Sequence, residues 1–496
     1  MLALCLLLVL NSGCTRDAQD STGPGVDDDD DDDQQPGEPL YAAAGRAVIS
    51  PDPRNHPEQI YLGGIYPSRM GTGVHDELLA SALMLQQGDN QVVLVSLDLL
   101  GFTRTRAREI QQRLEGQGIE PEHVLIASTH THEAPDTMGV FGPDVLHSGV
   151  SPAYMRFIQD SVVDLVLSLR EQLVPVNMRA VKVDVNDPLS NYPTLIADSR
   201  HPYITVPWLT AAGFDDTEGN TVATLVNWHS HPEVMIESTL VSSDFPKWVR
   251  DRVRDKTGGE CVYISGALGG LSSPTGVDVA ARDENGDPVM DGSGDPLYLQ
   301  DGTWDKARSL GYVIADLALD DLDAAEPLED PHLNVAVWQM PLPVENIIMI
   351  AAYFLGILEF DDLGLITDNP DFCGWLGCMD DRLGFVRLGP LALITSPGET
   401  FPETFIGRPE SILDFGEPWG PTAFPAIRGL TEFMNAEVPM HMSVCGNEIG
   451  YLIPEPDFHP RGHPDYYEED LFLGYDTETI YYNTAIEIMA SVPAAR

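Results

Sequence analysis

The feature of this sequence that most constrains its fold is a strand–helix–strand pattern between residues 91 and 128. Residues 91–100 (QVVLVSLDLL) form a continuous run of β-branched residues and leucines, which is typical of a buried strand. Residues 106–114 have the pattern of a short amphipathic helix, and residues 124–128 (VLIAS) form a second apolar run. This order predicts a βαβ unit, in which functional residues gather beyond the carboxyl ends of the strands.

Two histidines follow directly at that position. His130 and His132 belong to the run STHTH at residues 128–132. Residues two apart on an extended segment face the same side, so both imidazole rings can point into one site. A second pair, His229 and His231, follows the apolar run 221–227 (TVATLVN).

Three further apolar runs also end in polar, Gly-rich or Pro-rich loops. These runs are 262–265, 391–395 and a stretch near 442–446, and the loops that follow them are 266–274, 396–399 and 447–451. No repeat of fixed period is present. We therefore expect an α/β fold: one large catalytic domain with a mixed β-sheet core, whose strand-end loops assemble a single site.

The histidine pairs point to a metal. Zinc prefers imidazole and carboxylate ligands, and a catalytic zinc site keeps one position open for water. The two pairs offer four imidazoles, and Glu399 offers a carboxylate at another strand end. A buried structural role is the usual explanation of a single histidine, but two pairs at strand ends favour a metal site. The residues alone thus predict a metal-dependent hydrolase of undefined substrate.

The charge of the chain restricts its partners. Asp and Glu number 78 against 27 Lys and Arg, which gives a net charge of −51. Such a surface repels nucleic acids and anionic lipid, so we expect no nucleic-acid partner. The acidic turns within residues 283–301 leave two alternatives: a Ca²⁺ site or a surface hairpin. The absence of EF-hand spacing favours the hairpin.

The amino-terminal segment predicts export. Residues 1–10 are almost wholly apolar and too few to span a bilayer, and Cys14 follows after three small or polar residues. We interpret residues 1–14 as a signal peptide with a bacterial lipobox that leaves Cys14 lipidated; a plain cleaved signal is the alternative. Residues 15–39 read as a disordered acidic linker and residues 40–496 as the catalytic domain. The expected protein is an outer-membrane or cell-surface lipoprotein, or is secreted, and its oligomeric state stays open.

Two internal features complete the expectations. In an exported protein, four cysteines suggest two disulfides, and the expected pairs are Cys373 with Cys378 and Cys261 with Cys445. Residues 347–358 (IIMIAAYFLGIL) are the most apolar internal stretch. A buried core helix is the default interpretation, and a lipid-facing patch beside the site is the alternative.

A set of short runs resembles the catalytic domain of the neutral/alkaline (non-lysosomal) ceramidase family and keeps the family order over roughly residues 42–490. The most specific are residues 128–132 and the combination of 387–389 (RLG) with 397–399 (PGE). The others are 71–75 (GTGVH), 95–98 (VSLD), 231–232 (HP) with 240–244 (LVSSD), 268–272 (LGGLS), and 450–451 (GY) with 467–468 (YE).

The resemblance implies a specific site and reaction. It implies one zinc ion held by two His, one Glu and one Tyr. Carried over, the zinc ligands are His130, His231, Glu399 and Tyr451; the catalytic residues are His132 and Ser272; and Tyr467 contacts the substrate. His132 would meet the substrate carbonyl or the developing oxyanion. The implied reaction is cleavage of an N-acyl amide by zinc-activated water, as when ceramide yields a sphingoid base and a fatty acid.

The chain also departs from the family pattern. The family run Gly-Asp-x-Ser-Pro-Asn reads GGLSSP at residues 269–274, and a substrate-contacting arginine is replaced by Asp187. We also expect no C-terminal immunoglobulin-like domain. Relative to the family pattern, the residues matched to the metal ligands are kept, whereas residues at positions that contact the substrate are changed. Two alternatives therefore stay open: a zinc-dependent amidase or esterase of the same fold acting on a non-ceramide substrate, and a non-catalytic lipid-binding surface protein.

Overall fold

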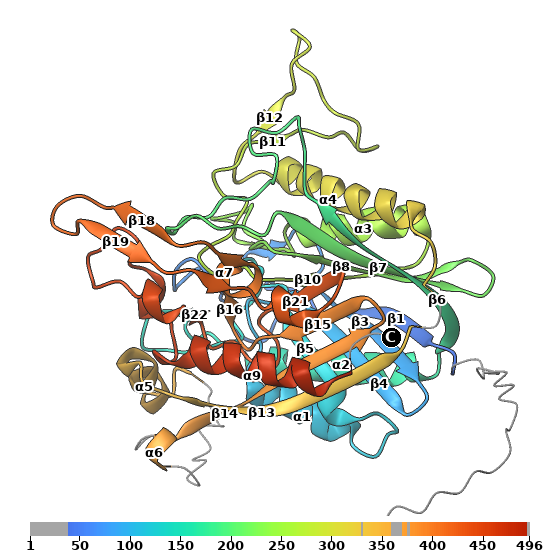
Figure 1. Cartoon of the computed structure of the whole chain (residues 1–496), viewed down its shortest axis with the longest axis horizontal. Helices are drawn as coiled ribbons and strands as arrows, with labels where there is room; N and C mark the ends of the chain where they lie inside the picture. The colour runs from blue at the N-terminus through green and yellow to red at the C-terminus, as the bar shows by residue number, and fades with distance from the viewer. Residues whose placement is uncertain (1–37, 329–330, 359–369, 374–376, 494–496) are drawn as a thin grey trace, which may run out of the picture. The chain divides into compact units, whose positions relative to one another are not determined.

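Two large β-sheets form the core of the described part of the chain. The computed structural model describes residues 38–328, 331–358, 370–373 and 377–493. The larger sheet has eight strands in the order β10-β8-β7-β6-β1-β3-β4-β5, and the smaller has four in the order β13-β14-β15-β21 (Figure 1). The predicted signal peptide and Cys14 lie outside the described residues, so export and lipidation stay predictions.

Both sheets are mixed. In the larger sheet β4 is parallel to β5 and β8 is parallel to β10, while in the smaller sheet β15 is parallel to β21; the other pairs are antiparallel. The strands of the larger sheet are β1 (Tyr41–Val48), β3 (Leu79–Gln87), β4 (Asn90–Leu97), β5 (Val124–Ser128), β6 (Val174–Asp184), β7 (Trp208–Asp216), β8 (Thr221–Trp228) and β10 (Glu260–Ser265). Those of the smaller sheet are β13 (Leu333–Pro343), β14 (Cys378–Leu388), β15 (Leu391–Thr395) and β21 (Val438–Met442).

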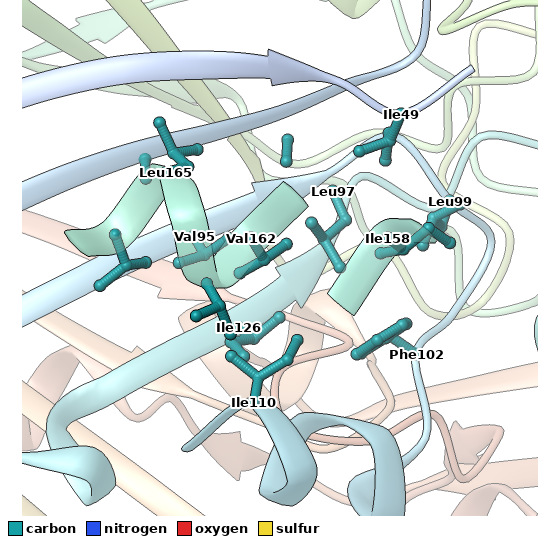
Figure 2. Close-up of a cluster of buried hydrophobic side chains, with 14 of the residues drawn as sticks. Ile49, Val95, Leu97, Leu99, Phe102, Ile110, Ile126, Ile158, Val162 and Leu165 are labelled. Atoms are coloured by element: carbon teal, nitrogen blue, oxygen red, sulfur yellow. The ribbon is translucent and has the colours of Figure 1, made fainter. Parts of the chain in front are cut away.

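Helices cover the outer faces of both sheets. On the larger sheet, α1 (Arg104–Leu114) and α2 (Pro152–Arg170) cover one half. Figure 2 shows Ile110 of α1 and Val162 of α2 converging on Val95 of β4. The other half is covered by α3 (Phe245–Thr257) and α4 (Trp304–Ala324), and the smaller sheet by α9 (Thr477–Ser491). The layers therefore run helix, sheet, sheet, helix.

Burial on both faces explains the continuous apolar strands. In β15, Leu391 and Leu393 point into the core between the two sheets. Ala392 and Ile394 point into the core beneath α9. Because neither face of the strand meets water, no polar alternation is selected. The predicted α/β class with a mixed-sheet core is confirmed, and so is the βαβ unit, because β5 lies parallel to β4 after α1.

One predicted strand is misplaced. The strand expected near residues 442–446 lies at β21, which ends at Met442. Val444 then adopts a left-handed backbone with φ of 53°, a conformation that breaks a strand. The following Cys445 donates its backbone N–H to the carbonyl of Ser396, 2.8 Å away. Residues 443–446 are therefore a loop that leaves the sheet and contacts the loop after β15.

Of the two predicted disulfides, one is present and the other is not. Cys373 and Cys378 form the predicted local bridge. The second predicted pair is wrong, because Cys261 and Cys445 are free thiols. Cys261 belongs to the core beneath α3 and α4, whereas Cys445 belongs to the core between the two sheets. Each thiol is a small buried apolar group, and separate cores keep the two apart.

Most of the apolar stretch 347–358 is not buried. Residues Ile347–Phe354 form α5, and no residue of this helix is buried, so the core-helix interpretation is wrong. Only Ile357 and Leu358, at the end of the stretch, are buried. Ile347 is 78% exposed and Phe354 is 67% exposed. Among the described residues no helix combines the length and hydropathy needed to cross a membrane. The exposed face of α5 agrees with the alternative of a lipid-facing patch.

The acidic turns form the expected hairpin. Strand β11 (Val279–Ala280) pairs antiparallel with β12 (Tyr298–Leu299) at its base. Asp283 and Asp291 each accept backbone N–H groups two and four residues ahead. These aspartates therefore close the hairpin turns, which favours the surface-hairpin alternative over the Ca²⁺ site.

Candidate metal centre

Three buried imidazoles meet at one end of the larger sheet. The ring centroid of His130 lies 5.1 Å from that of His132 and 5.0 Å from that of His231. The His132 and His231 centroids are 5.9 Å apart. One possible ligand atom from each ring lies within 4.8 Å of the other two. The structure therefore brings together members of both histidine pairs.

Hydrogen bonds between the edges of the larger sheet create this meeting. Strands β5 and β10 are the two edge strands. Ser265, at the end of β10, donates its hydroxyl to the carbonyl of Thr129 at 2.7 Å, and Ser96 of β4 donates to the carbonyl of Tyr263 at 2.6 Å. These contacts tie β10 to β4 and to the residue after β5, close to where β5 and β10 end. The loops after β5 and β8 therefore face one another.

Backbone carbonyls orient two of the rings. His130, with φ of 69°, donates Nδ1–H to the carbonyl of Leu100 at 2.7 Å. His231 donates Nδ1–H to the carbonyl of Ser272 at 3.1 Å. A carbonyl oxygen only accepts, so each ring holds its proton on Nδ1 and presents Nε2 to the site. This is the tautomer in which protein histidines bind metals through Nε2.

Glu399 joins these two Nε2 atoms. One carboxylate oxygen lies 2.9 Å from Nε2 of His231, and the other lies 3.5 Å from Nε2 of His130. Glu399 opens β16 (Glu399–Thr400), which pairs in parallel with β22 (Tyr451–Leu452) and sets Tyr451 opposite Glu399. The four residues carried over as metal ligands thus come from distant segments to one place.

The charges of this cluster are complementary. Burial alone would raise the pKa of Glu399, but His130 and His231 outweigh it and lower the pKa to about 2. Burial lowers the pKa of His231, yet the hydrogen bond that its protonated Nε2 donates to Glu399 and nearby negative charge raise the pKa to about 9. The pKa of His130 is raised by the same carboxylate despite its burial. An anionic carboxylate beside two Nε2 atoms is a donor set that fits a divalent cation.

His132 differs from its neighbours. Burial, together with the charges of His130 and His231, holds the pKa of His132 well below its usual range. Its Nδ1 lies 3.0 Å from Oε1 of Glu233, outside hydrogen-bonding geometry, and neither ring nitrogen has a hydrogen-bond partner among the described residues. His132 is therefore a neutral imidazole whose Nδ1 faces Glu233 and whose Nε2 is left for a ligand.

A cavity of about 290 Å³ opens beside the cluster. Its polar wall consists of His130, His132, Glu399, Glu448, Tyr451 and Tyr467. Its apolar wall consists of Ile65, Leu100, Met138, Val140, Phe141, Met349, Leu358 and Leu471. The combination of an apolar cleft and a few convergent polar groups is the usual form of a small-molecule site.

The other predicted residues lie at varying distances from this cavity. Tyr467 is at its edge, 52% exposed, with its ring centroid 6.2 Å from that of Tyr451. Ser272 is fully buried behind the cluster, and its hydroxyl has no hydrogen-bond partner among the described residues. Its contact with the cluster runs through its carbonyl, which holds His231.

His229 and Asp187, which the sequence analysis singled out, lie outside the cluster. His229 accepts the backbone N–H of Ala267 at 2.9 Å and stacks on Phe405, and burial lowers its pKa to about 3. Asp187 forms a buried ion pair with Arg282 at 3.0 Å. Both side chains therefore stabilise the loops around the cluster.

Sequence reasoning missed two acids of the site. Glu448 lines the cavity, and Glu233 lies against His132. The only sequence feature that points to a site role for Glu448 is its place in the 447–451 loop. For Glu233, the only such feature is its place shortly after His231. Burial and the charge of Glu399 raise the pKa of Glu448 to about 8, although His130 opposes them. A lone acid in a loop gives no pattern that separates it from surface acids.

A second histidine cluster is less suited to a cation. His459, His463 and Asp465 also lie within ligand distance of one another. However, Nδ1 of His463 accepts the backbone N–H of Asp465 at 3.1 Å, which places the ring proton on Nε2. The guanidinium of Arg200 also donates to the Asp465 carbonyl at 2.9 Å and opposes a second positive charge.

The fold can be compared with known structures. Its layered mixed sheets match solved structures of ceramidases. The crystal structure of neutral ceramidase from Pseudomonas aeruginosa matches with a TM-score of 0.64 and 14% identity, over 92% of this chain and 76% of that chain. A structure described as ceramidase complexed with C2 matches with the same values. The chain therefore has the ceramidase fold, as the resemblance implied.

Comparisons by sequence found no match. No family model matches the chain, and no curated protein matches it.

Proposed function

We propose that this protein is a zinc-dependent hydrolase that cleaves the N-acyl amide bond of a lipid-like substrate. The observation that carries the proposal is the placement of Glu399 between Nε2 of His130 and Nε2 of His231, at the floor of an apolar cavity. His130, His231, Glu399 and Tyr451 would hold the ion. Zinc in such a site supplies a Lewis acid and lowers the pKa of water to about 7.

The residues of the chain supply the remaining requirements. Nε2 of the neutral His132 ring has no partner among the described residues, and with its proton on Nε2 the ring can stabilise the carbonyl oxygen as negative charge develops on it. The carbonyls of Leu100 and Ser272 keep the two Nε2 atoms pointed at one place. The apolar wall excludes water from the acyl chain, which strengthens these polar contacts.

The surroundings of the cavity support a lipid-like substrate. We call the exposed apolar side chains of α5 and the residue after it the α5 patch: Ile347, Ile348, Phe354 and Leu355, which are 48–78% exposed. Met349 of the same helix lines the cavity, so the helix that carries the patch borders the cavity. In a chain of net charge −51, this uncharged patch suits a zwitterionic lipid surface better than an anionic one.

The ceramide assignment is the finer part of the proposal. The two solved structures compared above are named ceramidases, so ceramide is the first substrate to test. The changes at residues 269–274 and at Asp187 make short N-acyl amides and esters the second. A non-catalytic lipid-binding protein would bind either class without turnover.

The decisive test is fatty-acid release from ceramide by purified protein, followed by mass spectrometry. We expect release that stops when a chelator removes the metal and returns when zinc is added back, because the ion activates the attacking water. Short N-acyl amides and esters run in parallel identify the substrate class. Release that persists after complete metal removal, or zinc-loaded protein inert toward every amide, would contradict the proposal.

The α5 patch gives a separate prediction. Replacing Ile347 and Phe354 together with glutamate should weaken binding to phosphatidylcholine vesicles, and slow hydrolysis of vesicle-borne substrate, by at least about tenfold. Hydrolysis of a soluble short-chain amide should not change, since none of the four patch residues lines the cavity. Vesicle co-sedimentation and product release measure the two effects.

The matched control is Ile412→Glu. Ile412 is 67% exposed on β18 (Ser411–Asp414), outside the residues that line the cavity. If this variant loses as much vesicle binding as the double variant, general acidity and not the α5 patch governs the interaction.

A further inference from the structure

We infer that Arg69 is a positioning residue, which fixes the ring of His132 by tying the loop of residues 63–68 to the backbone of His132. The inference rests on the proposed function, in which His132 stabilises the carbonyl oxygen of the substrate. Arg69 is 2% exposed and is not among the residues that line the cavity. It therefore acts through its neighbours and not on the substrate.

The guanidinium of Arg69 joins two backbone segments. Its Nη2 donates to the carbonyl of Gly63 at 2.5 Å and also to the carbonyl of His132. A hydrogen bond between the main chains continues this tie, because Gly63 donates its N–H to the carbonyl of Ala134 at 2.8 Å. The start of the 63–68 loop is thus held against the segment that carries His132.

The 63–68 loop also lies against the imidazole ring itself. Gly64 has a φ of 79°, and a Cβ at this position would lie 2.6 Å from Cγ of His132 and 2.7 Å from its Nδ1. If the loop moves away, the ring gains room to turn out of the orientation that meets the carbonyl oxygen of the substrate. Gly64 and Ile65 line the cavity too, so one loop sets both the ring and part of the wall.

The ion pair of Arg69 does not explain why a charge is buried here. Nη1 lies 3.6 Å from Oε1 of Glu133, and neither carboxylate oxygen of Glu133 has a hydrogen-bond partner among the described residues. A loosely paired buried couple adds little net stability, because the loss of hydration offsets the attraction. The close contacts of this guanidinium are the ones to the two carbonyls, and these contacts fix the loop.

The variant Arg69→Met tests this role, because it keeps the apolar stem and removes the donors. We expect an unchanged zinc content. For a soluble short-chain ceramide, kcat should fall by about tenfold to a hundredfold with a smaller rise in KM, because a misplaced oxyanion donor weakens mainly the transition state. Arg69→Lys keeps the charge but lacks the planar fork that spans both carbonyls, so its kcat should be intermediate. Arg69→Lys carries the test if Arg69→Met does not fold.

A double variant separates positioning from general destabilisation. On a His132→Ala background, Arg69→Met should change kcat by less than about twofold, because its effect passes through the missing ring. Arg179→Met is the matched control. Arg179 also donates to a backbone carbonyl, that of Leu322 at 2.7 Å, and pairs with Asp215, but it lies outside the residues that line the cavity. Its replacement should leave kcat within about twofold of the wild type.

Hydrogen exchange tests the tie without turnover. On metal-free protein, the backbone N–H of Gly63 should exchange at least about tenfold faster in Arg69→Met, because the loop opens more often. Mass spectrometry of the peptides that cover residues 61–70 and 132–136 measures the change. The control Arg179→Met should leave the exchange of both peptides as in the wild type.

Three results would overturn the inference: unchanged kcat in a folded Arg69 variant, an equal loss of kcat from Arg69→Met with and without His132, or unchanged exchange of Gly63. Failure of the proposed function looks different. In that case zinc-loaded wild type releases no fatty acid, whereas the faster exchange in Arg69→Met remains.

Discussion

Replacing His130 with alanine is expected to remove the bound zinc and to lower kcat/KM for amide hydrolysis by at least about a thousandfold, or about 4 kcal/mol of transition-state stabilisation. The side chain presents Nε2 to the cluster and shares Glu399 with His231. Without it the site keeps one imidazole and one carboxylate of the proposed set besides Tyr451. Elemental analysis of zinc per chain and steady-state kinetics measure both losses.

His229→Ala is the matched control for this prediction. His229 is also a buried histidine at the end of β8, but its Nδ1 is bound to the backbone of Ala267 and its ring lies outside the three-imidazole cluster. Its replacement should lower stability and leave the zinc content of the folded protein unchanged. A His130→Ala protein that keeps stoichiometric zinc would contradict the ligand assignment.

The second large effect is expected at His132. Its replacement with alanine should leave zinc in place and lower kcat by about a hundredfold to a thousandfold, with a smaller change in KM. This is the loss found when a single oxyanion-stabilising donor is removed. The reason is that Nε2 of His132 has no partner among the described residues beside the cavity, while Glu399 contacts the other two imidazoles.

The result at His132 also decides between two ligand sets. The three imidazoles of His130, His132 and His231 lie close enough to bind one ion without Glu399. If His132→Ala loses zinc and Glu399→Gln keeps it, the three-histidine set holds the metal and the role of His132 in oxyanion stabilisation is wrong. Zinc content measured on both variants therefore separates the two arrangements.

Several parts of the site could be predicted because they depend on local pattern. β5 and β15 have both faces buried, so each reads as an unbroken apolar run, and the residue after such a run stands at a sheet end. That is why His130, His132 and Glu399 were found. Glu448 and Glu233 stand in irregular loops, where no periodicity separates an inward-facing acid from a surface one.

Two predictions failed because burial is a property of the whole fold. The α5 segment has the composition of a core helix, but no element among the described residues packs over its exposed side. Cys261 and Cys445 were matched by elimination, and the structure assigns them to separate cores. In both cases the residue types are compatible with either outcome, and only the neighbours in space decide.

The sequence by itself determined the α/β class, the βαβ unit and the strand ends that carry His130, His132, His231 and Glu399, because side-chain period and turn residues are local properties. Only the tertiary structure decided that these ends meet. Strands β5 and β8 are not neighbours, and hydrogen bonds from Ser96 and Ser265 join the edges of the sheet so that the two loops face each other. Long-range contacts of this kind leave no periodic trace in the chain, since a serine that ties two edges together has the same letter as a serine on the surface.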